Sequence, residues 1–130
     1  MIVLLAGLLA VAAPPSEPQA DLSKLLVGKW AGNFVIPRGG QQQRVLVVES
    51  VHHRDGGWMA TARFGPSDES LFPANATLEV SGSEVRLKFK VAGSNEANLV
   101  LRGDSELAGT FKIPTNQGLR EVPMTLKKVQ

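Results

Sequence analysis

The stretch EVRLKFKV, residues 84 to 91, alternates strictly between charged and apolar side chains. Its apolar residues, Val85, Leu87, Phe89 and Val91, fall on one face of an extended strand, and its charged residues fall on the other. Successive side chains of a strand point to opposite faces, so this pattern is typical of a strand with one buried and one solvated side. The stretch therefore predicts an antiparallel sheet that covers a core with one face.

The same alternation continues through most of the chain beyond residue 20. We expect eight strands, over residues 28–36, 43–53, 57–64, 75–80, 84–92, 96–102, 106–113 and 120–128. Most links between them are short and rich in turn residues, as in Asp55-Gly56-Gly57, which favours hairpins. The pattern predicts an all-β fold, an eight-stranded up-and-down antiparallel barrel, with a β-sandwich as the alternative. Pro123 lacks a ladder donor and indicates a bulge or a frayed seam in the last strand.

The N-terminal segment differs in composition from these strands. Residues 1–12 are mostly apolar and end in an A-x-A motif at residues 10–12, so they are typical of a signal peptide. Three prolines indicate a linker over residues 13–20, and a short helix is expected over residues 21–27. Residues 21–130 then form one barrel domain. This organisation predicts a periplasmic or secreted protein with no transmembrane span after removal of the leader.

The composition excludes several kinds of chemistry. The 130 residues include no cysteine, which excludes disulfides, thiolate catalysis and thiolate metal sites. His52 and His53 are adjacent on a strand, point to opposite faces and cannot hold one metal ion together, and Ser50 near them has no orienting carboxylate. Outward basic residues such as Arg86 and Lys88 have no aromatic neighbours for base stacking. We therefore expect no enzymatic activity, no cofactor, no metal site and no nucleic-acid partner.

Two patterns resemble known families. GKW at residues 28–30 is similar to the Gly-x-Trp signature that opens the first strand of lipocalins. The order GKWAGNFVI, DGGWMATARFGPSDES, ELAGTFKI and VPMTLKK resembles small bacterial exported β-barrel domains, found alone or N-terminal to serine-hydrolase domains in secreted esterases. Such modules carry no catalytic residues, so the resemblance implies a non-enzymatic barrel. A lipocalin-like barrel also implies a basic side chain over Trp30, here from Lys127 or Lys128.

The expected interior supplies the candidate binding residues. Aromatic and apolar side chains predicted to line the barrel or its mouth are Trp30, Phe34, Trp58, Phe64, Phe72, Phe89, Phe111 and Met124. Trp30 is expected to plug one end, with Gly32 leaving room for it; contact with a ligand is the alternative. An eight-stranded interior is either filled or open to one small ligand, and the inner Ala and Gly positions favour a small cavity. We expect a monomer that binds a small apolar or amphipathic molecule; the alternative is a filled barrel that contacts an envelope protein.

The longest expected connection runs from Gly65 to Asn75. Its Leu71-Phe72 pair is apolar within an otherwise polar segment bracketed by prolines. Functional loops carry such residues where they cap a pocket or meet a partner, so this segment is expected to be a lid or a recognition edge. The alternative is that Phe72 packs into the barrel mouth as part of the core.

Overall fold

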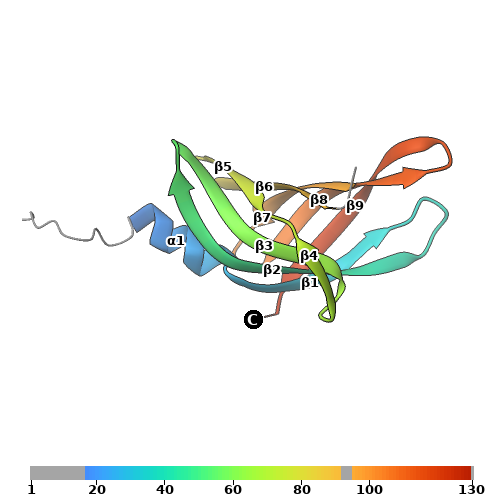
Figure 1. The fold of residues 1–130 in the computed structure, drawn as a ribbon, viewed down its shortest axis with the longest axis horizontal. Helices are drawn as coiled ribbons and strands as arrows, with labels where there is room; N and C mark the ends of the chain where they lie inside the picture. Colours follow the sequence, from blue (N-terminus) through green and yellow to red (C-terminus); the bar gives the residue numbers. More distant parts are fainter. Residues whose placement is uncertain (1–16, 92–94, 130) are drawn as a thin grey trace, which may run out of the picture.

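The fold is a closed antiparallel β-barrel with one short helix (Figure 1). The computed structural model describes residues 17–91 and 95–129, so the expected leader lies outside the described residues. Within them the elements are α1 (Glu17–Leu26), β1 (Gly28–Val35), β2 (Gln41–Arg54), β3 (Gly57–Ser67), β4 (Ser70–Pro73), β5 (Ala76–Ser81), β6 (Glu84–Val91), β7 (Asn95–Arg102), β8 (Glu106–Thr115) and β9 (Gly118–Lys128). The sheet order is β2-β1-β9-β8-β7-β6-β5-β3-β4, and pairing of β2 with β3 closes the barrel. The up-and-down barrel predicted from the alternation is confirmed.

β4 and β5 together form one of the eight strands of the wall. Both pair with β3, and one register runs from Leu78 to Phe72, which lies opposite Phe64. The register then shifts between Phe64 and Ser67. Between the two pieces, the amide of Ala74 donates to the carbonyl of Ala62 at 2.9 Å, and the side-chain oxygen of Asn75 accepts from the Ala62 amide at 3.3 Å. The long connection expected at this point is therefore largely a β-hairpin, so its prediction as a loop is wrong. Burial does not alternate along β4, where Ser70 and Leu71 are half-buried and Phe72 and Pro73 are exposed, so the sequence pattern does not reveal this strand.

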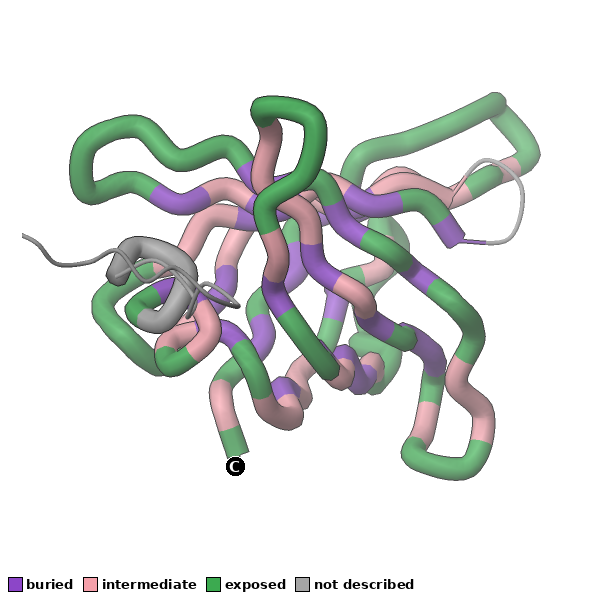
Figure 2. Tube along the Cα trace, turned by 60° about the vertical axis from the view of Figure 1, so that its left-hand side comes forward, coloured by how far each residue is buried: buried purple, intermediate pink, exposed green. Residues whose placement is uncertain are grey.

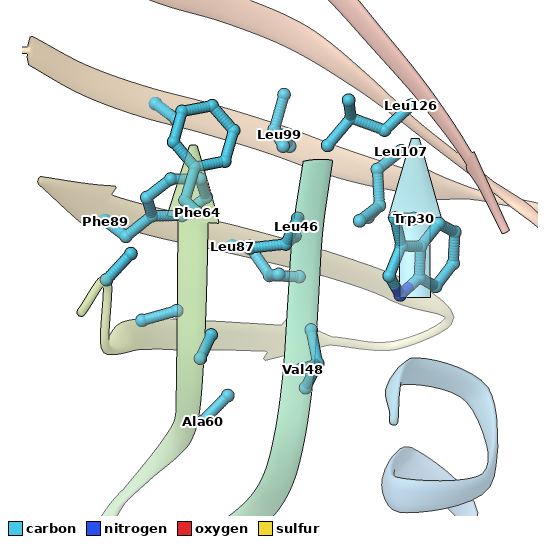
Figure 3. Close-up of a cluster of buried hydrophobic side chains, with 14 of the residues drawn as sticks. Trp30, Leu46, Val48, Ala60, Phe64, Leu87, Phe89, Leu99, Leu107 and Leu126 are labelled. Carbon is cyan, nitrogen blue, oxygen red and sulfur yellow. The ribbon is translucent and has the colours of Figure 1, made fainter. Parts of the chain in front are cut away.

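The helix α1 covers one end of the barrel, which we call the closed end (Figure 1). It begins at Glu17, inside the stretch expected to be a linker, and ends at Leu26. Leu22 and Leu26 are buried, and Trp30 of β1 is buried completely at the side of the core nearest the helix (Figure 3). The indole Nε1 of Trp30 donates a hydrogen bond of 2.9 Å to the carbonyl of Leu26. Trp30 therefore fills the barrel at its closed end.

Lys128 connects the last strand to the helix. Its Nζ donates to the carbonyls of Lys24 at 3.1 Å and Leu25 at 2.8 Å, and lies 5.5 Å from the centroid of the Trp30 ring. The last carbonyls of a helix have no partners within the helix, and a cation near that end is favoured by the helix dipole. Of the two lysines that the sequence leaves open, Lys128 covers Trp30, whereas Lys127 is exposed.

The core runs through the length of the barrel. Buried and exposed residues alternate along the strands (Figure 2). The largest fully buried side chains are Trp30, Phe64, Phe111, Leu26, Leu46, Leu87, Leu99, Leu107, Met124, Leu126, Val45 and Val48. Along β2 the inward face changes parity, because a bulge between Val48 and Ser50 leaves both Val48 and Val51 buried. This shift explains why neither parity of residues 44–53 is inward throughout.

Gly32 and Gly109 lie where neighbouring strands approach each other closely. A Cβ atom on Gly32 would collide with the backbone carbonyl of Thr125, and one on Gly109 would collide with that of Asn98. Glycine in a strand often marks such an approach or a bend at a barrel corner. The expectation that Gly32 leaves room for Trp30, and that the inner glycines favour a cavity, is therefore wrong. The space beside these residues is occupied by backbone.

Candidate ligand-binding site at the open end

The end of the barrel opposite α1 is here called the open end. The turns that join β1 to β2 and β8 to β9 project from it (Figure 1). A cavity of about 460 Å³ lies between these two turns and is lined by Ile36, Pro37, Arg38, Ile113, Pro114, Thr115, Asn116, Gln117 and Arg120. Its volume falls within the range of roughly 300–1,000 Å³ that is usual for small-molecule sites. We refer to it as the mouth cavity.

The apolar walls of the mouth cavity come from two Ile-Pro pairs. Ile36 and Ile113 continue the inward parity of β1 and β8, and both are partly buried against the core. Pro37 and Pro114 follow them directly, and all four residues line the cavity. The two pairs therefore give the cavity apolar surfaces on both sides, continuous with the interior of the barrel.

The separation of the two turns begins at Pro123. The pairing of β1 with β9 runs from Trp30 opposite Lys128 to Phe34 opposite Met124, and stops immediately before Pro123. The pairing of β8 with β9 continues past it, with Thr110 opposite Pro123. Because proline has no N–H, it cannot donate to a neighbouring strand. Of the two readings of Pro123, the frayed seam is confirmed, and the mouth cavity lies beyond the point where the seam ends.

Hydrogen bonds fix the polar side of the mouth cavity. The Thr115 hydroxyl donates to the carbonyl of Gly118 at 2.7 Å and accepts from the amide of Gln117 at 3.1 Å. The side-chain oxygen of Gln117 in turn accepts from Nη2 of Arg120 at 2.8 Å. The turn between β8 and β9 therefore holds the Arg120 guanidinium in a defined position beside the cavity.

Below the mouth cavity the interior is filled by aromatic rings. The centroids of Phe34 and Phe111 lie 5.2 Å apart, those of Phe64 and Phe111 5.5 Å, and those of Phe64 and Phe89 5.0 Å. All four side chains are at most 3% exposed. Such distances are typical of tilted and edge-to-face ring contacts in packed cores. The room for a ligand is therefore at the mouth and not among these rings.

Arg44 lies directly over this aromatic layer. Its parity on β2 is that of the buried Leu46, and its guanidinium carbon lies 4.8 Å from the centroid of the Phe34 ring. One of its nitrogens donates to the carbonyl of Gln43 at 2.7 Å. Burial lowers the pKa of the Arg44 guanidinium from its usual value, but the group stays protonated at neutral pH. Arg44 therefore contributes a partly buried positive charge next to the aromatic layer.

The eight candidate residues are divided among three levels of the barrel. Trp30 and Trp58 lie toward the closed end, where Trp58 is half-buried and its ring centroid lies 4.7 Å from that of the exposed His53. Phe34, Phe64, Phe89, Phe111 and Met124 form the buried middle. Phe72, opposite Phe64 on β4, is 52% exposed. None of the eight lines the mouth cavity.

The hairpin of β3 and β4 crosses the outer wall. Asp68 at its turn pairs with Lys29 of β1 at 2.8 Å, although β2 lies between β3 and β1 in the sheet. Val45 of β2 has outward parity but is only 2% exposed and stands apart from the main core. The hairpin turn therefore lies across the outside of β2. Phe72 on its second strand remains exposed, which contradicts the alternative in which it packs as core.

Replacing Phe72 with serine is expected to lower the free energy of unfolding by no more than about 1 kcal/mol, because the side chain is already largely in water. The matched change Phe64→Ser, at its buried cross-strand partner, should cost about 3–5 kcal/mol. Urea denaturation followed by circular dichroism measures both values. A loss at Phe72 equal to that at Phe64 would show that Phe72 belongs to the core.

Comparison with protein-family models, with curated proteins and with solved structures yields no match. Among the described residues, no group of three or more His, Asp or Glu side chains is placed to hold a metal ion. None of the helical structure in residues 17–91 and 95–129 is long and apolar enough to span a bilayer. The function therefore has to be argued from the site itself.

The sequence-based search missed the residues that form the cavity walls. Ile36 and Ile113 have the inward parity of core residues, and each is followed directly by a proline. Arg38 lies two residues after Ile36, and Arg120 lies opposite Ile113 on β9. One signal was present. The dipeptide Ile-Pro ends the apolar pattern in both GNFVIPRGG and GTFKIPTNQG, so the two turns that form the cavity share a motif.

Proposed function

We propose that this protein is a non-enzymatic, exported, lipocalin-like barrel that binds a small apolar or amphipathic molecule at its open end. The observation that carries the proposal is the mouth cavity, whose walls are the two Ile-Pro pairs. Apolar surface in a concave site with a few polar groups is the usual setting for a small ligand. Export is supported by the leader-like composition of residues 1–12, and the bacterial exported modules named above remain the proposed relatives.

The substitution Ile36→Asn tests this site. The variant is expected to bind a neutral hydrophobic dye such as Nile red about tenfold more weakly than the unchanged protein. This corresponds to the loss of an apolar wall contact of about 1.4 kcal/mol. Val35→Asn is the matched control, since Val35 is the preceding residue on β1 but faces outward and is 41% exposed. Fluorescence titration measures both. Absence of saturable dye binding, or equal loss in the two variants, would contradict the proposal.

The second candidate is an accessory module that contacts an envelope protein through its surface. Its support is the filled aromatic middle of the barrel together with the exposed Phe72 on the β3–β4 hairpin. Large apolar side chains on a surface hairpin are common at protein contacts. Native mass spectrometry after mild purification separates the two candidates. A co-purified lipid-like molecule favours ligand binding, whereas a reproducible protein partner with an empty mouth cavity favours the accessory module.

A further inference from the structure

The mouth cavity has cationic residues but no carboxylate among the residues that line it. Arg38 and Arg120 both line it, and Arg44 lies over Phe34 in the layer below. Within residues 17–91 and 95–129, none of the three forms an ion pair. Arg120 contacts only a neutral amide oxygen of Gln117, and Arg44 contacts a backbone carbonyl and an aromatic ring. Two arginines therefore line the mouth cavity, and the described residues provide no ion-pair partner for either.

Five carboxylates of the barrel form ion pairs away from the mouth cavity. Within the described residues, the ion pairs are Lys29–Asp68, Arg63–Glu49, Arg86–Glu84, Lys88–Glu79 and Lys112–Glu96, with nitrogen to oxygen distances from 2.8 to 3.3 Å. All five basic partners have outward parity in their strands. Glu96 is the acidic partner nearest the open end, and it pairs with Lys112 on the outer wall. These five acids therefore pair with bases on the outer wall and not with the arginines of the mouth. Glu121 follows Arg120 directly on β9, but it has outward parity and does not line the mouth cavity.

We infer that the mouth cavity takes an amphipathic anion, a molecule with one carboxylate or phosphate group joined to an apolar chain. This inference rests on the proposed function and adds the chemical class of the ligand. A guanidinium offers paired N–H donors that match a carboxylate or a phosphate, and a cleft lined by one sign of charge attracts ions of the other sign. Arg38 and Arg120 are the residues that bind the anionic group.

The remaining walls match the apolar part of such a molecule. Ile36, Ile113 and the prolines beside them provide the apolar surface of the same cavity. Arg120 is held by Gln117, whose turn is fixed by the Thr115 hydroxyl, so little side-chain freedom is lost when an anion binds. The charge of Arg44, partly removed from water, also gains from a nearby anion because burial makes its hydration incomplete.

The test compares ligands with the same ten-carbon chain by isothermal titration calorimetry, below their micelle concentrations. Decanoate and decyl phosphate are expected to bind at least about tenfold more tightly than decanol, and decyltrimethylammonium more weakly than decanol. Acetate and inorganic phosphate supply the anion without the chain, and both should bind at least about a hundredfold more weakly than their ten-carbon counterparts. The affinity of the two chain anions should fall as salt is added.

The double substitution Arg38→Gln with Arg120→Gln removes both charges and keeps side chains of similar polarity. It is expected to abolish the preference for decanoate over decanol, so that the two ligands bind the variant with similar affinity. Arg54→Gln with Arg102→Gln is the matched control, because both arginines are exposed next to turns at the closed end. That control should retain the full preference for decanoate.

The possible outcomes separate this inference from the proposed function. If no ten-carbon ligand binds, the proposed function itself fails. If decanol binds as tightly as decanoate, or if the double variant keeps the preference, the ligand site remains and the anionic class is overturned. If inorganic phosphate binds as tightly as decyl phosphate, the site is a simple anion site and the amphipathic class is overturned.

Discussion

Replacing Trp30 with alanine is expected to lower the free energy of unfolding by about 3–5 kcal/mol. The indole is fully buried, donates its N–H to the carbonyl of Leu26, and lies beneath the ammonium group of Lys128. Its removal leaves a cavity under the helix and a helix-end carbonyl without its partner. A loss of this size is a large share of the 5–15 kcal/mol that usually stabilises a domain.

The control for this substitution is Trp58→Ala. Trp58 is the other tryptophan of the chain and also lies toward the closed end, but it is half-buried and contacts an exposed histidine. Its loss is expected to cost less than half as much as the loss of Trp30. Urea denaturation followed by far-ultraviolet circular dichroism measures both free energies of unfolding. Tryptophan fluorescence is unsuitable because each variant keeps a different tryptophan, so the two signals would not be comparable. Equal losses would mean that Trp30 does not fill the closed end as described.

Replacing Gly109 with alanine is expected to cost about 3 kcal/mol or more, although the change adds a single methyl group. The new Cβ would collide with the backbone carbonyl of Asn98 on β7. A side chain can often rotate away from a clash, but a carbonyl paired in a sheet can move only if the strands separate. The melting temperature should therefore fall by about 10 °C or more.

Gly57→Ala is the matched control for this effect. The atom nearest to a Cβ on Gly57 is the carbonyl oxygen of Arg54, at an ordinary contact distance of 3.8 Å. Gly57 also has no positive φ, so alanine fits its backbone. This variant should melt within a few degrees of the unchanged protein. Differential scanning calorimetry measures both, and a Gly109 variant as stable as the Gly57 variant would disprove the close approach of β7 and β8.

The parts of the fold that follow from local alternation are predictable from sequence. Residues 84–91 form β6, with the apolar side chains buried as expected. The direction of each side chain there depends only on its position along its own strand. The hairpin at residues 65–75 and the bulge of β2 were not predicted, because both depend on pairing with β3. Gly32 and Gly109 were misinterpreted for the same reason: the atoms that crowd them belong to other strands.

The candidate site was less predictable than the fold. Apolar inward residues serve as core and as ligand surface, and hydrophobicity alone does not separate Phe111, which is buried, from Ile113, which lines the mouth cavity. Whether an inward residue is core or ligand surface depends on where the pairing of β1 with β9 ends. In the sequence, only Pro123 indicates that point. The sequence does not mark Arg38 and Arg120 as site residues, because a charged residue in a turn is usually just exposed to solvent. That the cavity between the two turns is lined by arginines and by no carboxylate becomes visible only when the turns are placed side by side.

The bonds from Lys128 to the carbonyls of Lys24 and Leu25 join residues 104 and 103 positions apart. A ribosome releases the N-terminal part of a chain first, so α1 emerges long before the lysine that completes its last turn. β1 likewise lacks its hydrogen-bonded neighbour in the sheet until β9 has been synthesised. Contacts between distant parts of a chain form slowly because a long loop must close first. The end of α1 and the strand β1 therefore gain these contacts only after β9 is in place, and a chain that lacks Lys128 loses both hydrogen bonds to the helix.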